Sequence, residues 1–194
     1  DLLIKKINKI MYYDVERPNR VVFDVETMNP HPRPDYPIMM NVNDINGILL
    51  ANNVPNSSLF SLIRVLANLS LREGFFDEMT ENALDALVAT IVFNDFFPNF
   101  NLKEAEFFEE PPLYSELCEI HFKVNELIFP MIFKQSRMFE TEMFDVDDDK
   151  WISFVKQLSH IGHRNFTTLF ENSRPIPLNI ASTLQGLPEY IPQS

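Results

Sequence analysis

Residues 57–94 form the stretch that most strongly limits what this chain can fold into. Leucine, isoleucine and valine recur there at intervals of three and four residues in two successive runs, which predicts two helices joined by a short turn. Phe60 and Val65 widen the apolar stripe of the first run, so we expect that helix to be buried on more than one side. A single pair of this kind cannot cover its own apolar faces, and neighbours on both sides must do so.

Local signals set the ends of this helix pair. We expect Ser57 or Ser58 to be the N-cap of the first helix and Thr80 to cap the second, because serine and threonine side chains accept hydrogen bonds from free backbone amides. Gly74 lies in the intervening turn and suits a left-handed residue after a helix C-terminus. Pro98 ends the second helix.

The remaining sequence predicts further helices and no strong strand pairing, so the fold class is mainly α. A third long helix is expected from Pro112 to about Ile128, where Pro130 kinks or ends it. A fourth helix contains Trp151. The aspartates just before Trp151 lie at the N-terminus of this helix, where the helix dipole favours negative charge. Other helices are expected at residues 2–13, 43–50, 165–171 and 177–187.

The N-terminal region is expected to be an extended arm. Residues 21–23 are a short β-like run, and four prolines follow within eight residues, at positions 30, 32, 34 and 37. Such a density of proline excludes regular structure there. We therefore divide the chain into residues 1–40, a helix with a proline-rich arm, and residues 41–194, a helical repeat-like domain.

Composition excludes several functions. The 194 residues carry a net charge of −12, which disfavours direct binding to nucleic acid. The four glycines are scattered, so no glycine-rich loop can hold a nucleotide phosphate. No apolar run approaches the length of a membrane span. The single Cys118 fits a reducing, intracellular compartment, and the Asp-Leu-Leu start without a signal peptide suggests an internal piece of a longer protein.

Asp24 and Glu26 form the most suggestive catalytic motif. An Asp-x-Glu pair on a strand resembles the first metal-binding motif of 3′-to-5′ exonucleases. The further carboxylates and the base that this chemistry needs do not follow at a suitable distance, and the long alternation of strands and helices is missing. A solvated acidic face on an extended arm is the interpretation we prefer.

Other candidate groups are incomplete as sites. His160 and His163, with Glu171 as a guessed third ligand, do not define a metal site. The aspartates at positions 145 and 147–149 lack the glycine and the distal glutamate of a calcium loop. Cys118 and His121 lack an orienting third group. We expect no cofactor, no metal and no enzymatic activity.

The aromatic residues of the turns and loops are the candidate partner contacts. Two interpretations remain open: the rings fold back over the ends of the helices, or they dock another protein. The candidates are Tyr36, Phe75, Phe76, Phe96, Phe97, Phe100, Phe107 and Phe108.

The stretch LIRVLANLSLREGFFDEMTENALDALVATIVF resembles one unit of an armadillo or HEAT array. It is more particularly similar to the armadillo-like region of the AT-rich-interaction-domain subunits of SWI/SNF-type chromatin remodellers. The acidic run that leads into Trp151 fits the same pattern, so the resemblance covers residues 57–94 and 145–188. The insert between them and the proline-rich arm have no counterpart in that family.

This resemblance implies an α-solenoid without catalytic residues that acts as a scaffold in a large nuclear assembly. Its expected partners are other protein subunits, with no membrane and no direct contact with nucleic acid. Two alternatives stay open: a structural subunit of a virus-like shell, since chains rich in Asn and Phe with extended arms suit subunit packing, and a metal-dependent exonuclease fragment that uses Asp24 and Glu26.

Overall fold

Helices make up most of the chain in the computed structural model, which describes residues 2–12, 21–24, 38–41, 55–138 and 146–192. The prediction of a mainly α-helical fold is confirmed. The chain divides into two compact units. Unit 1 comprises Asp1–Leu71 and Asp85–Glu110, and unit 2 comprises Arg72–Leu84 and Pro111–Ser194. The predicted boundary at residue 40 stays a prediction.

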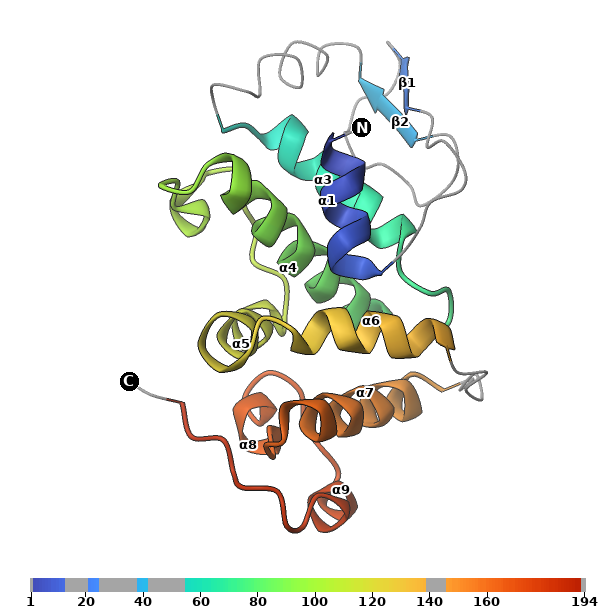
Figure 1. The fold of residues 1–194 in the computed structure, drawn as a ribbon, viewed down its shortest axis with the longest axis vertical. Helices are drawn as coiled ribbons and strands as arrows, with labels where there is room; N and C mark the ends of the chain where they lie inside the picture. The colour runs from blue at the N-terminus through green and yellow to red at the C-terminus, as the bar shows by residue number, and fades with distance from the viewer. Residues whose placement is uncertain (1, 13–20, 25–37, 42–54, 139–145, 193–194) are drawn as a thin grey trace. The chain divides into compact units, whose positions relative to one another are not determined.

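Unit 1 is built around the first helix of the predicted pair. Helix α1 (Leu2–Met11) packs against α3 (Ser57–Leu69) and buries Ile7 and Met11 (Figure 1). The larger part of α4 (Glu78–Phe96) and the short 3-10 turn η1 (Leu102–Glu104) complete this unit. On the surface, Lys6 of α1 forms an ion pair with Asp95 of α4 at 2.5 Å.

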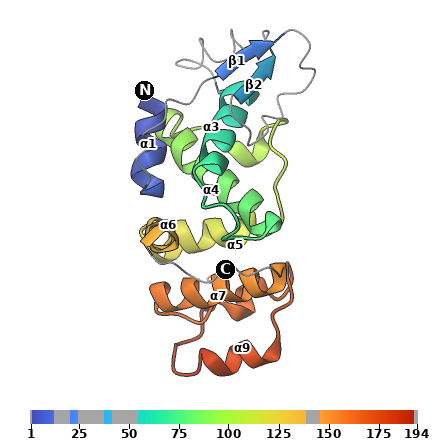
Figure 2. The same cartoon turned by 90° about the vertical axis from the view of Figure 1, so that its right-hand side faces the viewer.

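Two short strands also belong to unit 1. Strand β1 (Val21–Asp24) pairs in parallel with β2 (Ile38–Asn41) (Figure 2). In the register of this pair, Val21 lies opposite Ile38. The β-like character of residues 21–23 is confirmed, whereas the partner strand at residues 38–41 was not expected. The four prolines of the expected arm and the expected helix at residues 43–50 lie outside the described residues.

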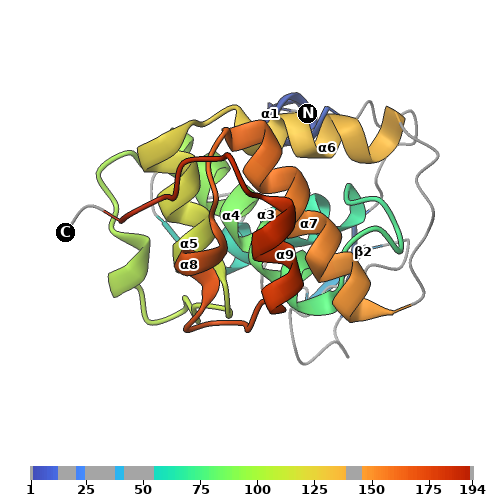
Figure 3. The ribbon, with the colours of Figure 1, turned by 90° about the horizontal axis from the view of Figure 1, so that it is seen from below.

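Unit 2 contains the first turns of α4 and all of the C-terminal helices (Figure 3). Helices α6 and α7 pack against each other, and the largest fully buried side chains of the unit include Trp151, Phe154 and Phe170. The described elements are α5 (Tyr114–Glu119), the π-helical turn η2 (Ile120–Val124), α6 (Ile128–Met138), α7 (Asp147–Gly162), α8 (Thr167–Phe170) and α9 (Leu178–Thr183).

Both predicted caps of the central helix pair are wrong by a short distance. The N-cap of α3 is Asn56, whose side-chain oxygen accepts a hydrogen bond from the Leu59 amide at 2.9 Å. At the start of α4, the Asp77 carboxylate accepts from both the amide and the hydroxyl of Thr80. In each case an Asx side chain precedes the predicted Ser or Thr and caps the helix in its place.

The expectation for Gly74 is confirmed in its conformation and wrong in its position. Gly74 has a φ of 72°, so its left-handed conformation is confirmed. It does not end α3, however, because Ser70 caps that helix and Gly74 lies in the turn beyond it.

The predicted third helix is two helices. Asn125 is extended (φ −164°, ψ 121°) and separates the π-helical turn η2 from α6. Pro130 therefore does not end a helix but lies in the first turn of α6, where its missing amide costs no hydrogen bond. Pro112 precedes α5, which starts only at Tyr114 because Leu113 is left-handed at φ 69°. The short predicted C-terminal helices are confirmed as α8 and α9.

The assignment of Asn56 as the cap of α3 can be tested by two alanine substitutions. We expect Asn56→Ala to lower the free energy of unfolding by about 1 kcal/mol, since the Leu59 amide loses its acceptor. Ser57→Ala, at the exposed first position of the helix, is expected to change it by less than ~0.5 kcal/mol. Urea unfolding followed by circular dichroism measures both changes in stability. A larger loss for Ser57→Ala than for Asn56→Ala would show that Ser57 is the N-cap.

Candidate partner-binding surfaces

Five of the predicted contact residues lie together in unit 1, around the fully buried Phe93. The ring of Phe97 lies 4.8 Å from that of Phe93, and Phe100 stacks on Phe107 at 6.2 Å. Phe108 lies edge-on to Phe60 at 5.6 Å. Phe96, the fifth, lies beneath the Lys6 amine, 5.4 Å from its ring centre. All five are half-buried, so these rings fold back onto the helices and leave only part of their surface for a partner.

Phe75 and Phe76 lie in unit 2 and also pack internally. Phe76 is 2% exposed and contacts Phe154 edge-on at 5.8 Å. Phe75 is half-buried and packs against Phe76 on one side and Arg72 on the other. Tyr36 lies outside the described residues. A role of these aromatic residues in partner binding stays a prediction, although the buried Phe76 is badly placed for it.

The sequence analysis missed an exposed apolar stripe on α6, formed by Leu127, Met131 and Met138. These side chains are 55%, 45% and 68% exposed. Their spacing of four and seven residues places them on one side of the helix, and the Met131 amide donates to the Leu127 carbonyl at 3.0 Å, so the helical geometry extends back to Leu127. The opposite side is the buried one, formed by Ile128, Phe129, Ile132, Phe133 and Ser136.

The surroundings of the α6 stripe are basic, in contrast to the acidic chain. Residues 120–138 contain Lys123, Lys134 and Arg137 but only one acidic residue, Glu126. Lys134 is exposed and lies within the stripe itself, three residues after Met131. The surface around α6 thus combines apolar area with positive charge.

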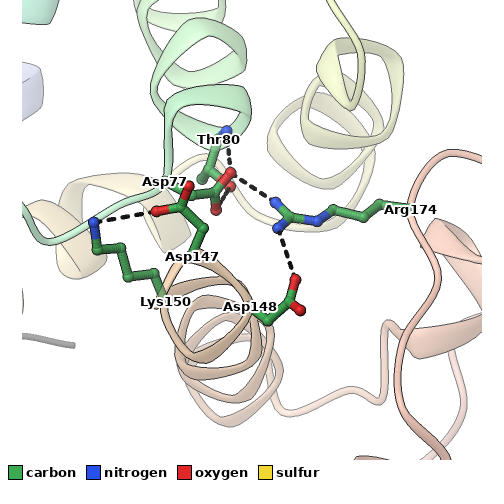
Figure 4. Close-up of polar contacts among 6 residues, drawn as sticks. All are labelled: Asp77, Thr80, Asp147, Asp148, Lys150 and Arg174. Atoms are coloured by element: carbon green, nitrogen blue, oxygen red, sulfur yellow. Dashed lines mark hydrogen bonds and ion pairs between the residues drawn. The ribbon is translucent and has the colours of Figure 1, made fainter. Parts of the chain in front are cut away.

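The best-connected polar group of unit 2 is centred on Asp77, which is 3% exposed (Figure 4). Besides Thr80, it binds the guanidinium of Arg174 at 2.6 Å. The same guanidinium lies 4.8 Å from the ring centre of Trp151 and 3.7 Å from Asp148. Arg174 therefore links the segment after α8 to the start of α4 and to the first turns of α7. This arrangement is that of a structural clamp.

In unit 1, Asp85 is a buried carboxylate bound by two side chains. Arg64 donates to it at 2.7 Å, and the Asn68 amide lies at 3.5 Å. Burial raises the pKa of Asp85 to about 6, although the charge of Arg64 acts against this. At neutral pH the pair is ionised.

His121 lies in the π-helical turn η2 and is 7% exposed. Its ring contacts Phe122 and Phe129, and its Nδ1 atom has no hydrogen-bond partner among the described residues. Burial lowers the pKa of this histidine, partly offset by Glu126. The imidazole is therefore neutral at neutral pH. Cys118 is half-buried one turn earlier.

The predicted metal-binding candidates remain dispersed in the part of the chain that the structure describes. Asp24 is the last residue of β1, and Glu26 and Asp145 lie outside that part. His160 lies in the last turn of α7, and His163 caps that helix with a φ of 50°; both are exposed. Within the described residues no group of three or more His, Cys, Asp or Glu could hold a metal ion.

Comparison with protein-family models, with curated proteins and with solved structures gave no match for this chain. The helices in the described ranges are all too short or too polar to cross a membrane. What this chain does must therefore be argued from its surfaces.

The Asp85–Arg64 pair predicts a dependence of stability on pH. In the unfolded chain this carboxyl titrates near 3.8, so between about pH 4 and pH 6 the folded protein holds a proton that the unfolded chain has released. Asp85 therefore makes the free energy of unfolding fall as the pH rises through this range. We expect Asp85→Asn to remove that component, as measured by urea unfolding at several pH values.

The same pair predicts a pH-dependent effect of Arg64→Leu. At pH 8 the substitution leaves a buried, ionised carboxylate without its cation, at a cost of about 3–5 kcal/mol. At pH 5 the carboxyl is protonated and the cost should be smaller. Lys103→Gln, which breaks the exposed pair with Glu110, is the control and should cost less than ~1 kcal/mol at either pH. Equal losses for Arg64→Leu at both pH values would contradict the assignment.

The Arg174 clamp predicts a strong stability effect in unit 2. Arg174→Leu leaves Asp77 buried, with Thr80 as its one remaining side-chain donor among the described residues, and should lower the free energy of unfolding by about 3–5 kcal/mol. Lys150→Gln breaks the pair with the exposed Asp147 and should cost less than ~1 kcal/mol. In a double-mutant cycle with Asp77→Asn, the two losses should not add. Additive losses would show that the pair is not coupled.

Proposed function

We propose that this chain is a non-enzymatic protein-interaction scaffold, one subunit of a larger assembly. The observation that carries the proposal is the α6 stripe. Leu127, Met131 and Met138 are three large apolar side chains that project from one side of a helix whose other side is already buried. Large apolar side chains exposed along one side of a helix are a feature of sites where another protein binds.

The properties of the stripe indicate what binds there. Two of its three residues are methionine, a flexible and polarisable side chain that adapts to a partner's shape. A second copy of the chain is disfavoured as the partner, because two chains of net charge −12 repel each other. Lys134 and Arg137 beside the stripe favour a different protein that presents apolar side chains flanked by acidic ones.

The resemblance described above leads to the more specific part of the proposal. We assign the chain to an armadillo-like α-solenoid in a nuclear chromatin-remodelling complex, where it would take part in transcription regulation without catalysing a reaction. Helices α3, α4 and α7 fall where this resemblance requires helices, which supports the assignment. The expected partners are other protein subunits.

Site-specific photo-crosslinking in cells tests the proposal. A benzoyl-phenylalanine residue at position 131 or 138 should crosslink to the same protein, identified by mass spectrometry as a subunit of a remodelling complex. The same probe at the half-buried Lys156 of α7 is the matched control and should not crosslink to it. Binding of the purified partner should weaken by about tenfold or more with Met131→Ser, without loss of helical circular dichroism.

Other outcomes would contradict the proposal. Crosslinks between copies of this chain, or particles formed by the purified protein, would favour a shell protein. Manganese-dependent degradation of single strands that is lost in Asp24→Ala would favour the nuclease. Equal crosslinking from positions 131 and 156 would show that the α6 stripe is not a specific surface.

A further inference from the structure

Unit 2 contains a pocket of about 390 Å³ whose walls come from three separate segments. The end of η2 supplies Lys123 and Val124, and the segment after α7 supplies Arg164. Residues 189–191 of the C-terminal segment complete the lining. We call this the Arg164 pocket.

The C-terminal wall of the Arg164 pocket is fixed by hydrogen bonds on both sides of residue 189. The Asn165 amide donates to the Pro188 carbonyl, and the Tyr190 amide donates to the Asn165 carbonyl, each at 2.9 Å. The phenol of Tyr190 donates to Glu119 at 2.9 Å, and its ring packs on Phe166 at 5.4 Å. The fold therefore holds this wall of the pocket in place.

The charged side chains of the Arg164 pocket differ in whether they have an ion-pair partner. The Lys123 amine lies 3.5 Å from Glu119, so part of its charge is already neutralised. The guanidinium of Arg164, by contrast, has no hydrogen bond or ion pair with any described residue, and neither has the carboxylate of Glu189. Burial, together with the bond to Glu119, raises the pKa of Tyr190 to about 12, so its phenol keeps its proton and stays bound to that carboxylate.

We propose that the Arg164 pocket binds a carboxylate group of an acidic segment in the protein that the chain holds. A guanidinium offers paired donors that match the two oxygens of a carboxylate. Val124 and Ile191, which is 75% exposed, supply apolar contact for a neighbouring side chain of the segment. The inference rests on the proposed function and names the chemistry of the partner that this part of unit 2 selects.

Glu189 makes the proposal sharply testable. Its unpaired carboxylate lines the same pocket and would repel an acidic segment, so removing this charge should tighten binding. For a basic or zwitterionic ligand, the same substitution should weaken binding. The sign of the effect at position 189 therefore distinguishes between the classes of ligand.

The probe is a short fluorescein-labelled peptide of alternating Glu and Leu, and its binding to the purified chain is measured by fluorescence anisotropy at low salt. We expect Arg164→Gln to weaken binding about tenfold and Glu189→Gln to tighten it by a factor of roughly 3. Lys156→Gln removes a charge outside the pocket and should leave the affinity unchanged. Peptides with a free or an amidated C-terminus distinguish a terminal carboxylate from acidic side chains.

Three results would overturn the inference: an equally tight complex with the matching Gln–Leu peptide, an unchanged affinity in Arg164→Gln, or weaker binding in Glu189→Gln. Circular dichroism of each variant checks that the fold is intact. If peptide binding fails while crosslinking from Met131 succeeds, the Arg164 pocket is refuted and the scaffold function stands. If crosslinking fails as well, the proposed function falls with it.

Discussion

The buried carboxylate of Asp77 is the interaction on which the arrangement of unit 2 depends. A carboxylate that is 3% exposed is costly unless its oxygens are bound, and here the amide and hydroxyl of Thr80 and the guanidinium of Arg174 bind them. Because Arg174 follows α8 while Asp77 precedes α4, this one contact joins parts of the chain that are 97 residues apart. The Trp151 ring lies 4.8 Å from the guanidinium and adds a cation–π contact to it. Unit 2 can present a fixed surface because its interior is tied together in this way.

Part of the surface of unit 2 differs in charge from the chain as a whole. The chain carries −12 overall, yet the segment with η2 and α6 is basic and also carries the exposed apolar side chains. Arg164 adds a cation at the pocket that is unpaired among the described residues. The cations of this part of unit 2 would attract an acidic partner, so the charge distribution favours a mode of binding that uses it. Apolar contact at α6 would then supply affinity, and the cations would supply selectivity.

How far the fold could be predicted depends on the range of the interactions concerned. Periodicity located α1, α3, α4 and α7, because an amphipathic helix carries its signal in its own sequence. The two predicted N-caps were wrong by one to three residues. Asn56 and Asp77 compete with the nearby Ser and Thr side chains for the free amides of the first helical turn, and only the geometry of the chain decides which side chain caps the helix. The break between η2 and α6 at Asn125 was not predicted, because Pro130 was read as the end of one helix although it lies in the first turn of the next. Strand β2 could not be foreseen from its composition alone, because its pairing with β1 is a contact between distant residues.

The two proposed surfaces also differ in whether a local sequence pattern could reveal them. The Arg164 pocket unites residues near positions 123, 164 and 190, and no local pattern connects them. The α6 stripe was also missed, but a local signal could have revealed it. Residues 127–138 place large apolar side chains on both sides of a helix, and a helix of that kind requires burial on both sides. Lys134 within the stripe argues against burial inside the chain's own core, because a core position would leave its ammonium unsolvated. An apolar surface that carries a lysine is better suited to an interface between proteins, where the amine can reach an acidic group at the rim. The stripe and its lysine together therefore point to a partner outside the chain.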